Sequence, residues 1–412
     1  MAASHGDEPT RLIRQLNRNV TVLAASIFGL ALGEELWQAY LPAYLTALGA
    51  SGLIVGVFGS CRDLLDSVYQ YPGGWLADRF GRQRALLIFT AMALAGYATY
   101  ALARTWPLVF AGLLGVMAWK SGAFPTTFAV IGDSLPRDRR AVAFSVQSIL
   151  VRLPRVISAP IGGLLIASLG IVAGIRVSLL VTLLLALVVL AVQRYGFREN
   201  RESAPRQESA RAGAILANLP PSLKRLLVSD SLVRIGEAVA TSFIVLYVMD
   251  VRHISAAEYG ILYAVQQGVS IAFYLPGGRI ADRTGRGPLV AVTFVFFAAF
   301  PLAVRLATSF PALVAAFCVG GLKEIGEPAR KSLIVDLAPD DRRGRAVGVY
   351  YGIRNLLVVP AGVAGGLLWQ RAPALPLEVS SAIGAIGIVV FLLTSRLTVT
   401  GPSTVNDRRG PG

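Results

Sequence analysis

Twelve long stretches of apolar residues follow one another along the chain, and most are separated by short polar connections. A helix of about 20 apolar residues crosses the hydrocarbon core of a bilayer. The pattern therefore predicts an all-α membrane protein with twelve transmembrane helices. The predicted spans are 21–48, 53–77, 85–104, 107–131, 141–168, 171–193, 224–249, 257–281, 288–308, 311–335, 345–370 and 375–396.

The longest polar connection lies between the sixth and seventh spans, at residues 194–223. It is rich in Arg, Glu, Ser and Pro, which predicts a flexible cytoplasmic linker. Its AGAILANL stretch is a candidate for a short helix on the membrane surface. The expected domains are an N-terminal bundle of six helices (1–193), the linker, a C-terminal bundle of six (224–397) and a disordered tail (398–412).

Composition agrees with a membrane protein. Hydrophobic residues make up 54% of the chain, charged residues 15%, and the mean hydropathy is +0.60. A disordered chain is excluded, because disorder needs low hydrophobicity. Two cysteines and two histidines exclude a disulfide framework, a cysteine-rich metal site and a His-cluster metalloenzyme. We therefore expect no metal, no cofactor and no catalytic residues.

The net charge of +15 reflects how the basic residues are placed. With the N-terminus inside, the cytoplasmic segments hold about 25 Lys and Arg, and cytoplasmic loops of membrane proteins carry such an excess. The outer loops hold four: Arg104, Arg252, Arg305 and Arg371. This asymmetry predicts a plasma (inner) membrane protein with both termini cytoplasmic. The lipid bilayer is then the basic chain's partner, and no nucleic acid is expected.

The second half of the chain repeats the first at an offset near 203 residues. The segment GGWLADRFGR at 73–82 reappears as GGRIADRTGR at 277–286. Gly33-Glu34 matches Gly236-Glu237, and Lys120 matches Lys323. Two six-helix halves related by duplication are typical of a transporter with a central site between its halves.

The segment GGWLADRFGRQRAL, between the second and third spans, resembles the signature loop of the major facilitator superfamily. The second copy, GGRIADRTGRG, stands where that family has a degenerate repeat. The resemblance extends over twelve spans, the division into two halves and the long middle loop. It implies the major facilitator fold and a secondary carrier that works by alternating access.

The two loops provide the candidate gating motif. Glycine at its first position lets two backbones approach closely, and glycine after the Asp-Arg pair allows a tight turn. The resemblance implies that Asp78 pairs across the interface between the halves and stabilises an outward-open state; the alternative is a topological anchor. The motif residues are Gly73, Asp78, Arg79, Gly81, Arg82, Gly277, Asp282, Arg283, Gly285 and Arg286.

Charged residues inside the spans are the most informative feature. Each costs roughly 2.5–3.5 kcal/mol at the bilayer centre and so needs a polar setting. They avoid the third, ninth and twelfth spans, which are peripheral in the family that the chain resembles. A central cavity is therefore predicted, and the candidates for binding substrate or protons are Glu34, Glu35, Asp63, Lys120, Arg152, Arg155, Arg234, Glu237, Gln267, Lys323, Glu327 and Arg354.

Two interpretations of these charges remain open. Most can be structural salt bridges, or a subset can bind the substrate and carry a coupling proton. Glu34, Glu237, Lys120 and Lys323 are the strongest candidates, because each lies near mid-span and recurs in both halves. Burial favours the neutral form of a carboxyl group, which suits proton exchange. Lysine and arginine suit an anionic group.

These features predict a monomeric secondary active transporter of a small solute, coupled to protons, with efflux of drug-like compounds as the leading function. The alternative is a carrier of an anionic metabolite, such as an organic acid or a phosphorylated compound. A polytopic membrane enzyme is a remote alternative, since the sequence has no HExxH or GxSxG motif. An aromatic cavity with few charges favours drugs, whereas converging Lys and Arg favour anions.

Overall fold

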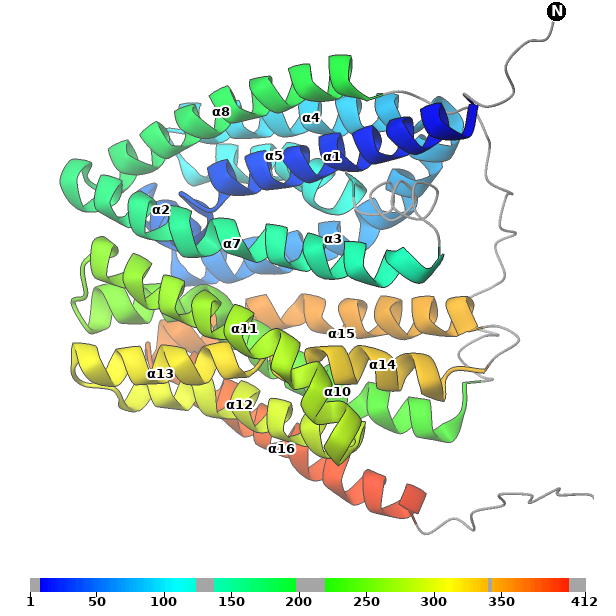
Figure 1. Ribbon diagram of the computed structural model, residues 1–412. Coiled ribbons are helices and arrows are strands. Elements are labelled where there is room, and N and C mark those ends of the chain that lie inside the picture. Colours follow the sequence, from blue (N-terminus) through cyan, green and yellow to red (C-terminus); the bar gives the residue numbers. More distant parts are fainter. Residues whose placement is uncertain (1–7, 124–136, 198–218, 340–342, 400–412) are drawn as a thin grey trace, which may run out of the picture.

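The computed structural model describes residues 8–123, 137–197, 219–339 and 343–399. Throughout these ranges the chain forms helices joined by short turns, with no β-strand. The first-half helices form one bundle and the second-half helices form another beside it (Figure 1). Paired along the chain as below, the helical segments make twelve spans, so the predicted fold class is confirmed.

The N-terminal bundle begins with a broken first span: α1 (Glu8–Glu34), a 3-10 turn (Gln38–Tyr40) and α2 (Leu41–Ala47). The fourth span also changes geometry, because α5 (Trp106–Met117) continues into a π-helical turn (Ala118–Gly122). The remaining helices are α3 (Gly52–Phe80), α4 (Arg82–Leu102), α7 (Arg137–Leu169) and α8 (Ile171–Gly196).

The C-terminal bundle repeats this order. Its first span, α10 (Pro221–Leu246), ends in a π-helical turn (Tyr247–Val251), and its fourth span is divided into α13 (Phe310–Leu322) and α14 (Glu327–Leu337). The other helices are α11 (Ala256–Thr284), α12 (Arg286–Leu306), α15 (Arg343–Arg371) and α16 (Leu375–Val399). Most of the predicted linker, its candidate surface helix and the predicted tail lie outside the described residues.

Two of the predicted spans are interrupted next to a proline, whereas Pro160 and Pro360 lie inside continuous helices. Pro42 and Pro328 stand in the first turns of α2 and α14, where the missing amide hydrogen removes no helical hydrogen bond. Eight segments of the described chain reach the length and hydropathy of a membrane span. Spans that carry several charges, such as α3 and α11, fall below that hydropathy because they line the centre of the molecule.

A glycine lies at the same helix contact in both bundles, at positions that match in the sequence repeat. A Cβ atom on Gly33 of α1 would lie 2.9 Å from Thr182 of α8, and one on Gly236 of α10 would lie 2.7 Å from the Ser380 carbonyl oxygen of α16. Glycine therefore allows the first span of each half to touch the sixth span of that half. The sequence repeat corresponds to a repeat in packing.

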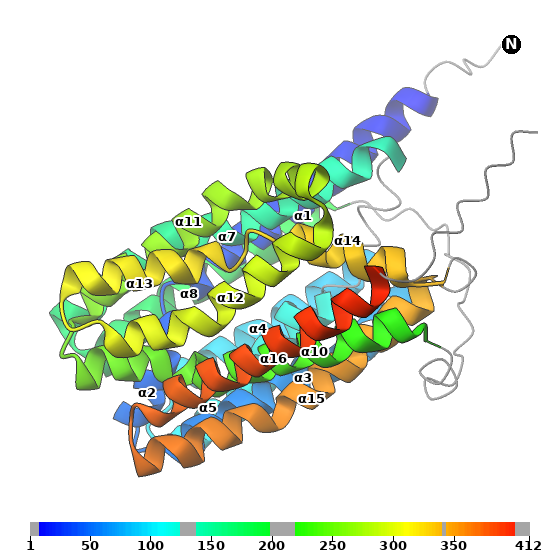
Figure 2. The same ribbon diagram turned by 90° about the horizontal axis from the view of Figure 1, so that it is seen from below.

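The halves meet along α3 with α15 and along α7 with α11, pairs that lie side by side in both views (Figure 2). A Cβ atom on Gly56 of α3 would overlap the Gly362 carbonyl oxygen of α15. The Tyr40 hydroxyl donates to the carbonyl oxygens of Ala159 and Ala256, at 2.8 and 3.1 Å, and so links α7 to α11. These contacts, called the outer seal below, lie towards the end of the bundle that is predicted to face outwards.

Candidate functional site

A cavity lies between the halves, on the predicted cytoplasmic side of the outer seal. It consists of three adjoining lobes of about 290, 300 and 150 Å³, and Thr241 of α10 contributes to all three. Helices from both bundles provide its walls. A solute at Thr241 would therefore contact both halves of the protein.

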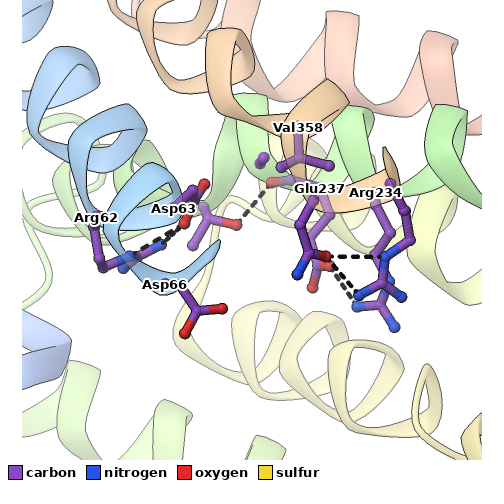
Figure 3. Close-up of a pocket in the computed structure, with 10 residues that line it drawn as sticks. Arg62, Asp63, Asp66, Arg234, Glu237 and Val358 are labelled. Atoms are coloured by element: carbon purple, nitrogen blue, oxygen red, sulfur yellow. Dashed lines mark hydrogen bonds and ion pairs between the residues drawn. The ribbon is translucent and has the colours of Figure 1, made fainter. Parts of the chain in front are cut away.

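Positively charged side chains outnumber acidic ones on the cavity lining. The lining cations are Arg62, Lys120, Arg152, Arg155, Arg234, Lys323 and Arg354. The lining acids are Asp63, Asp66, Glu237 and Glu324. Figure 3 shows Arg62 and Asp63 on one side of the first lobe and Arg234 and Glu237 on the other. More cations than acids therefore face the cavity, and Glu35, Glu327 and Asp230 pair with three of these cations from behind the lining.

Aromatic rings supply much of the remaining lining. Tyr259, Tyr263, Phe297, Phe300 and Phe317 line the second lobe, and Trp37 and Tyr100 line the third. Several rings also lie under cations, with the Lys323 ammonium 5.1 Å from the Phe297 ring centre. The cavity thus offers both apolar faces and charge, which suits an amphipathic solute.

In the C-terminal bundle the buried charges form one continuous chain of ion pairs. Lys323 contacts Glu237 at 2.6 Å. Glu237 contacts Arg234 at 2.9 Å (Figure 3). Arg234 also contacts Glu327 at 3.1 Å, and Glu327 contacts Arg330 at 2.6 Å. Each carboxylate therefore has at least two cationic neighbours.

The chain ends at Asp230, whose side chain is fully buried. Arg330 contacts it at 2.7 Å, Tyr350 donates a hydrogen bond to it at 2.9 Å, and Arg354 lies 3.5 Å away. These contacts tie α10, α14 and α15 together. A buried network of paired charges acts first as a structural element, because removing one partner leaves an uncompensated charge.

In the N-terminal bundle the candidate charges are separated into small groups. Glu35 contacts Arg155 at 2.9 Å, and Glu34 accepts a hydrogen bond from the Tyr97 hydroxyl at 2.5 Å. The Lys120 side chain forms no hydrogen bond or ion pair with any other residue that the structure describes. Lys120 faces the third lobe and lies within electrostatic range of Glu34 and Glu35.

One ion pair crosses between the halves inside the cavity. Arg152 of α7 contacts Glu324, in the break between α13 and α14, at 3.0 Å. The Arg152 guanidinium also lies 4.9 Å from the ring centre of Tyr274 on α11. This pair therefore joins α7 of one bundle to the helix break of the other.

Nine of the twelve predicted binding residues line the cavity: Asp63, Lys120, Arg152, Arg155, Arg234, Glu237, Gln267, Lys323 and Arg354. The other three, Glu34, Glu35 and Glu327, are 6%, 4% and 7% exposed and lie behind the lining. The structure therefore brings the predicted set together around one cavity. Whether each residue binds a solute or a proton stays a prediction.

Three residues of this region were not singled out from the sequence. Asp230 terminates the ion-pair chain, Tyr97 bonds to Glu34, and Thr241 lies at the centre of the cavity. Asp230 is four residues before Arg234, which places both on one helix face and is the signal that was available. Tyr97 and Thr241 carry no charge, so nothing in the pattern of charged residues marked them.

The candidate gating motif shows the expected turn geometry. Gly81 and Gly285 have φ angles of 87° and 86°, a conformation that favours glycine. Gly73 and Gly277 lie against the backbones of Gly122 and Ile325, where a Cβ atom would overlap a carbonyl oxygen. The gating role stays a prediction, because the side chains of Asp78 and Asp282 are outside the described part of the structure.

The basic residues of the motif lie at the same end of the helices as these glycines. Arg79 and Arg283 are exposed, in the last turns of α3 and α11, and Arg82 and Arg286 begin α4 and α12. Arg286 forms an ion pair with Asp336 of α14, inside the same bundle.

Two six-helix bundles around a charged cavity that is closed at one end have the architecture of a transporter that works by alternating access. The chain matches the family model of the Major Facilitator Superfamily over residues 23–233 and 226–411, and it belongs to that family. It is therefore a membrane transporter of small solutes rather than an enzyme.

Several known proteins are similar to this chain over most of their own length. An uncharacterised transporter of Methanocaldococcus jannaschii is 21% identical over 92% of this chain and 95% of its own. A multi-drug resistance efflux pump (PmrA homolog) of Lactococcus lactis is 25% identical over 85% of this chain and 88% of its own. The crystal structure of the nucleoside transporter NupG, at 12% identity, has a TM-score of 0.77 and covers 92% of this chain and 99% of that one.

Proposed function

We propose that this protein exports amphipathic organic compounds that carry an anionic group. The observation that supports this most is the surplus of cations over acids on the cavity lining, seven against four. The aromatic faces of the same cavity supply surface for the apolar part of the solute. The name of the Lactococcus lactis relative, an efflux pump, supports export as the direction.

Export of an anion has a simple driving force. A plasma membrane that is negative inside favours the outward movement of negative charge by about 2.3 kcal/mol per elementary charge per 100 mV. In proteoliposomes, a potential that is negative on the predicted cytoplasmic side should therefore accelerate the loss of 1-naphthoate, an aromatic carboxylate. Loss of this probe at the rate of protein-free liposomes would contradict the proposal.

A second candidate is proton-coupled export of neutral or cationic drug-like compounds. It is favoured by Glu34, which is buried and contacts the Tyr97 hydroxyl rather than a cation. In such an antiporter the solute and the proton compete for one carboxylate, so acidification weakens solute binding. For an anion near Lys120 the sign is opposite, because protonation of Glu34 removes a neighbouring negative charge.

The pH dependence of binding separates the two candidates. For the purified full-length protein we expect affinity for 1-naphthoate to rise as the pH falls, and Glu34→Gln to remove that dependence. Glu237→Gln is the matched control in the other half, and it should leave the dependence in place. Weaker anion binding at low pH, or an unchanged pH profile in Glu34→Gln, would remove Glu34 from the proton-binding role.

We also propose that Asp78 stabilises the outward-open state, in a monomer whose termini are both cytoplasmic. The Ser60 hydroxyl of α3 accepts a hydrogen bond from the Val363 amide of α15 at 3.1 Å, beside the outer seal. Asp78→Asn should shift the labelling of a Ser60→Cys probe towards the protected state. The same substitution at Asp282 gives the comparison with the second copy of the motif. An unchanged labelling pattern would leave Asp78 as an anchor of the loop.

A further inference from the structure

The two halves hold the same pair of charged residues at equivalent positions but use it differently. In the C-terminal bundle, the Glu237 carboxylate and the Lys323 ammonium are 2.6 Å apart. The equivalents in the N-terminal bundle are Glu34 and Lys120, which are not bonded to each other in the described structure. Glu34 instead accepts its hydrogen bond from Tyr97.

The reason for this difference is one hydroxyl group. Position 300 is the equivalent of position 97 at the repeat offset of 203 residues, and it is Phe300. Phe300 offers Glu237 no donor, and the Lys323 ammonium lies 5.8 Å from the Phe300 ring centre and close to Glu237. Tyr97 is fully buried and supplies a donor, so Glu34 has a partner without Lys120.

Lys120 is thereby left facing the third cavity lobe. Arg62 lines the same lobe, and its only ion pair among the described residues joins it to its neighbour Asp63 at 3.3 Å. That separation exceeds the roughly 2.7–2.9 Å of a strong charge-assisted hydrogen bond. Tyr263 adds ring surface to the lobe, and the buried rings of Trp37 and Tyr100 lie behind it.

Four other cations of the lining are held more tightly, and the fifth, Arg354, lies 3.5 Å from the fully buried Asp230. Glu324 contacts Arg152 at 3.0 Å, Glu35 contacts Arg155 at 2.9 Å, and Glu237 contacts both Arg234 and Lys323. A solute anion would have to displace a carboxylate to bind any of these residues. At Lys120 it would displace no ion-pair partner that the structure describes.

We propose that Lys120, with Arg62, binds the anionic group of the solute, and that Tyr97 is a positioning residue that keeps Glu34 from neutralising Lys120. This inference rests on the proposed export of organic anions, and it identifies the part of the cavity that selects them. The aromatic part of the solute packs against the Tyr263 ring.

The test uses three probes that share one ring system: 1-naphthoate, the neutral 1-naphthamide and the cationic 1-naphthylmethylammonium. Binding is measured on the full-length protein in lipid nanodiscs. We expect Lys120→Gln to weaken the binding of 1-naphthoate at least tenfold and to leave the binding of 1-naphthamide unchanged. Lys120→Arg should stay within about threefold of the unmodified protein, since it keeps the charge.

Lys323→Gln is the matched control, because it removes the same charge from a residue that already has a carboxylate partner. Lys323→Gln should weaken the binding of 1-naphthoate by less than threefold. An equal loss in Lys120→Gln and Lys323→Gln, or unchanged 1-naphthoate binding in Lys120→Gln, would overturn the assignment of Lys120. Retained binding of 1-naphthamide in each variant shows that the cavity has folded.

Tyr97→Phe tests the positioning role. Without the hydroxyl, Glu34 should pair with Lys120, and 1-naphthoate affinity should fall about tenfold at neutral pH. Acidification should restore it, because protonation releases Glu34 from Lys120, whereas the loss in Lys120→Gln should persist at low pH. A loss in Tyr97→Phe that acidification does not reverse, or no loss at all, would overturn the positioning role.

Failure of this inference can be told apart from failure of the proposed function. If anions cross proteoliposome membranes through the protein but the Lys120 variants behave normally, the inference is wrong and the function stands. If the unmodified protein prefers the neutral or the cationic probe, or binds none of the three, both are wrong.

Discussion

The two bundles share an ancestral repeat, yet they use charge in different ways. The C-terminal bundle holds Asp230, Arg234, Glu327, Arg330 and Arg354 in a connected network across α10, α14 and α15. At the repeat offset, the N-terminal bundle has Ile27, Ala31, Phe124, Thr127 and Val151 at the matching sequence positions. These five charges are therefore present together in one half and absent together from the other, whereas Glu237 and Lys323 at the end of the ion-pair chain match Glu34 and Lys120.

This difference follows from the energetics of buried charge. A single ionic residue in a buried position is expensive unless partners neutralise it, so a network of this kind is stable only as a complete set. The N-terminal bundle holds its charges in small separate groups and leaves Lys120 facing the cavity. We infer that one half provides a stiff wall and the other provides the charge that is available to a solute.

The largest expected effect is on the stability of the C-terminal network. Arg330→Met would leave Asp230 and Glu327 buried without their main cation and should lower the free energy of unfolding by about 3–5 kcal/mol. Lys120→Met in the other half should change it by less than about 1 kcal/mol, a small effect typical of groups without a strong ion pair. Thermal unfolding in nanodiscs measures both, and equal effects would contradict the proposed division of roles.

An intermediate effect is expected at two threonines that occupy equivalent positions. The Thr293 hydroxyl accepts a hydrogen bond from the Gly326 amide at 2.8 Å, in the break between α13 and α14. Thr293→Val leaves that buried amide without this partner and should lower the free energy of unfolding by about 1–3 kcal/mol.

Thr90 is the equivalent of Thr293, and it donates to the Gln193 side chain at 2.9 Å instead. Thr90→Val should cost less, since it removes a bond between two side chains rather than the partner of a backbone amide at a helix break. Unfolding in denaturing detergent compares the two variants. A larger loss for Thr90→Val would show that the helix break in the tenth span does not depend on the Thr293 hydroxyl.

The smallest effect is expected at the predicted outer end of the C-terminal bundle. Arg305 and Glu378 form an ion pair at 3.0 Å, but their side chains are 37% and 44% exposed. Arg305→Ala should lower the free energy of unfolding by less than about 1 kcal/mol, and added salt should reduce even that. A loss comparable to that of Arg330→Met would mean that exposure does not separate structural from dispensable pairs.

Much of the fold could be predicted from the sequence for simple physical reasons. The length of each apolar stretch predicts its span, and the matched loops at 73–82 and 277–286 predict two related halves. The breaks in the first and tenth spans were less accessible, because a proline that begins a new helix looks the same in sequence as one that kinks a continuous helix.

The sequence could predict which charged residues gather at the candidate site, but it could not predict which of them pair with one another. Charges inside apolar spans must share a polar environment, so their gathering around a cavity follows from the cost of burying them. The partner of each charge depends on distances between helices far apart in the chain. Glu34 and Glu237 look alike in sequence, and only the position of the hydroxyl on α4 shows that one bonds to Tyr97 and the other to Lys323.

The sequence by itself determined the twelve spans, the duplication and the charges that require a common polar interior, because hydrophobic length and burial cost act on each segment separately. The tertiary structure decided which charges neutralise one another and that Lys120 faces the cavity without an ion-pair partner among the described residues. A shift of a side chain by a few ångströms changes such pairing, since a hydrogen bond or a close ion pair forms only within a narrow range of distance and direction.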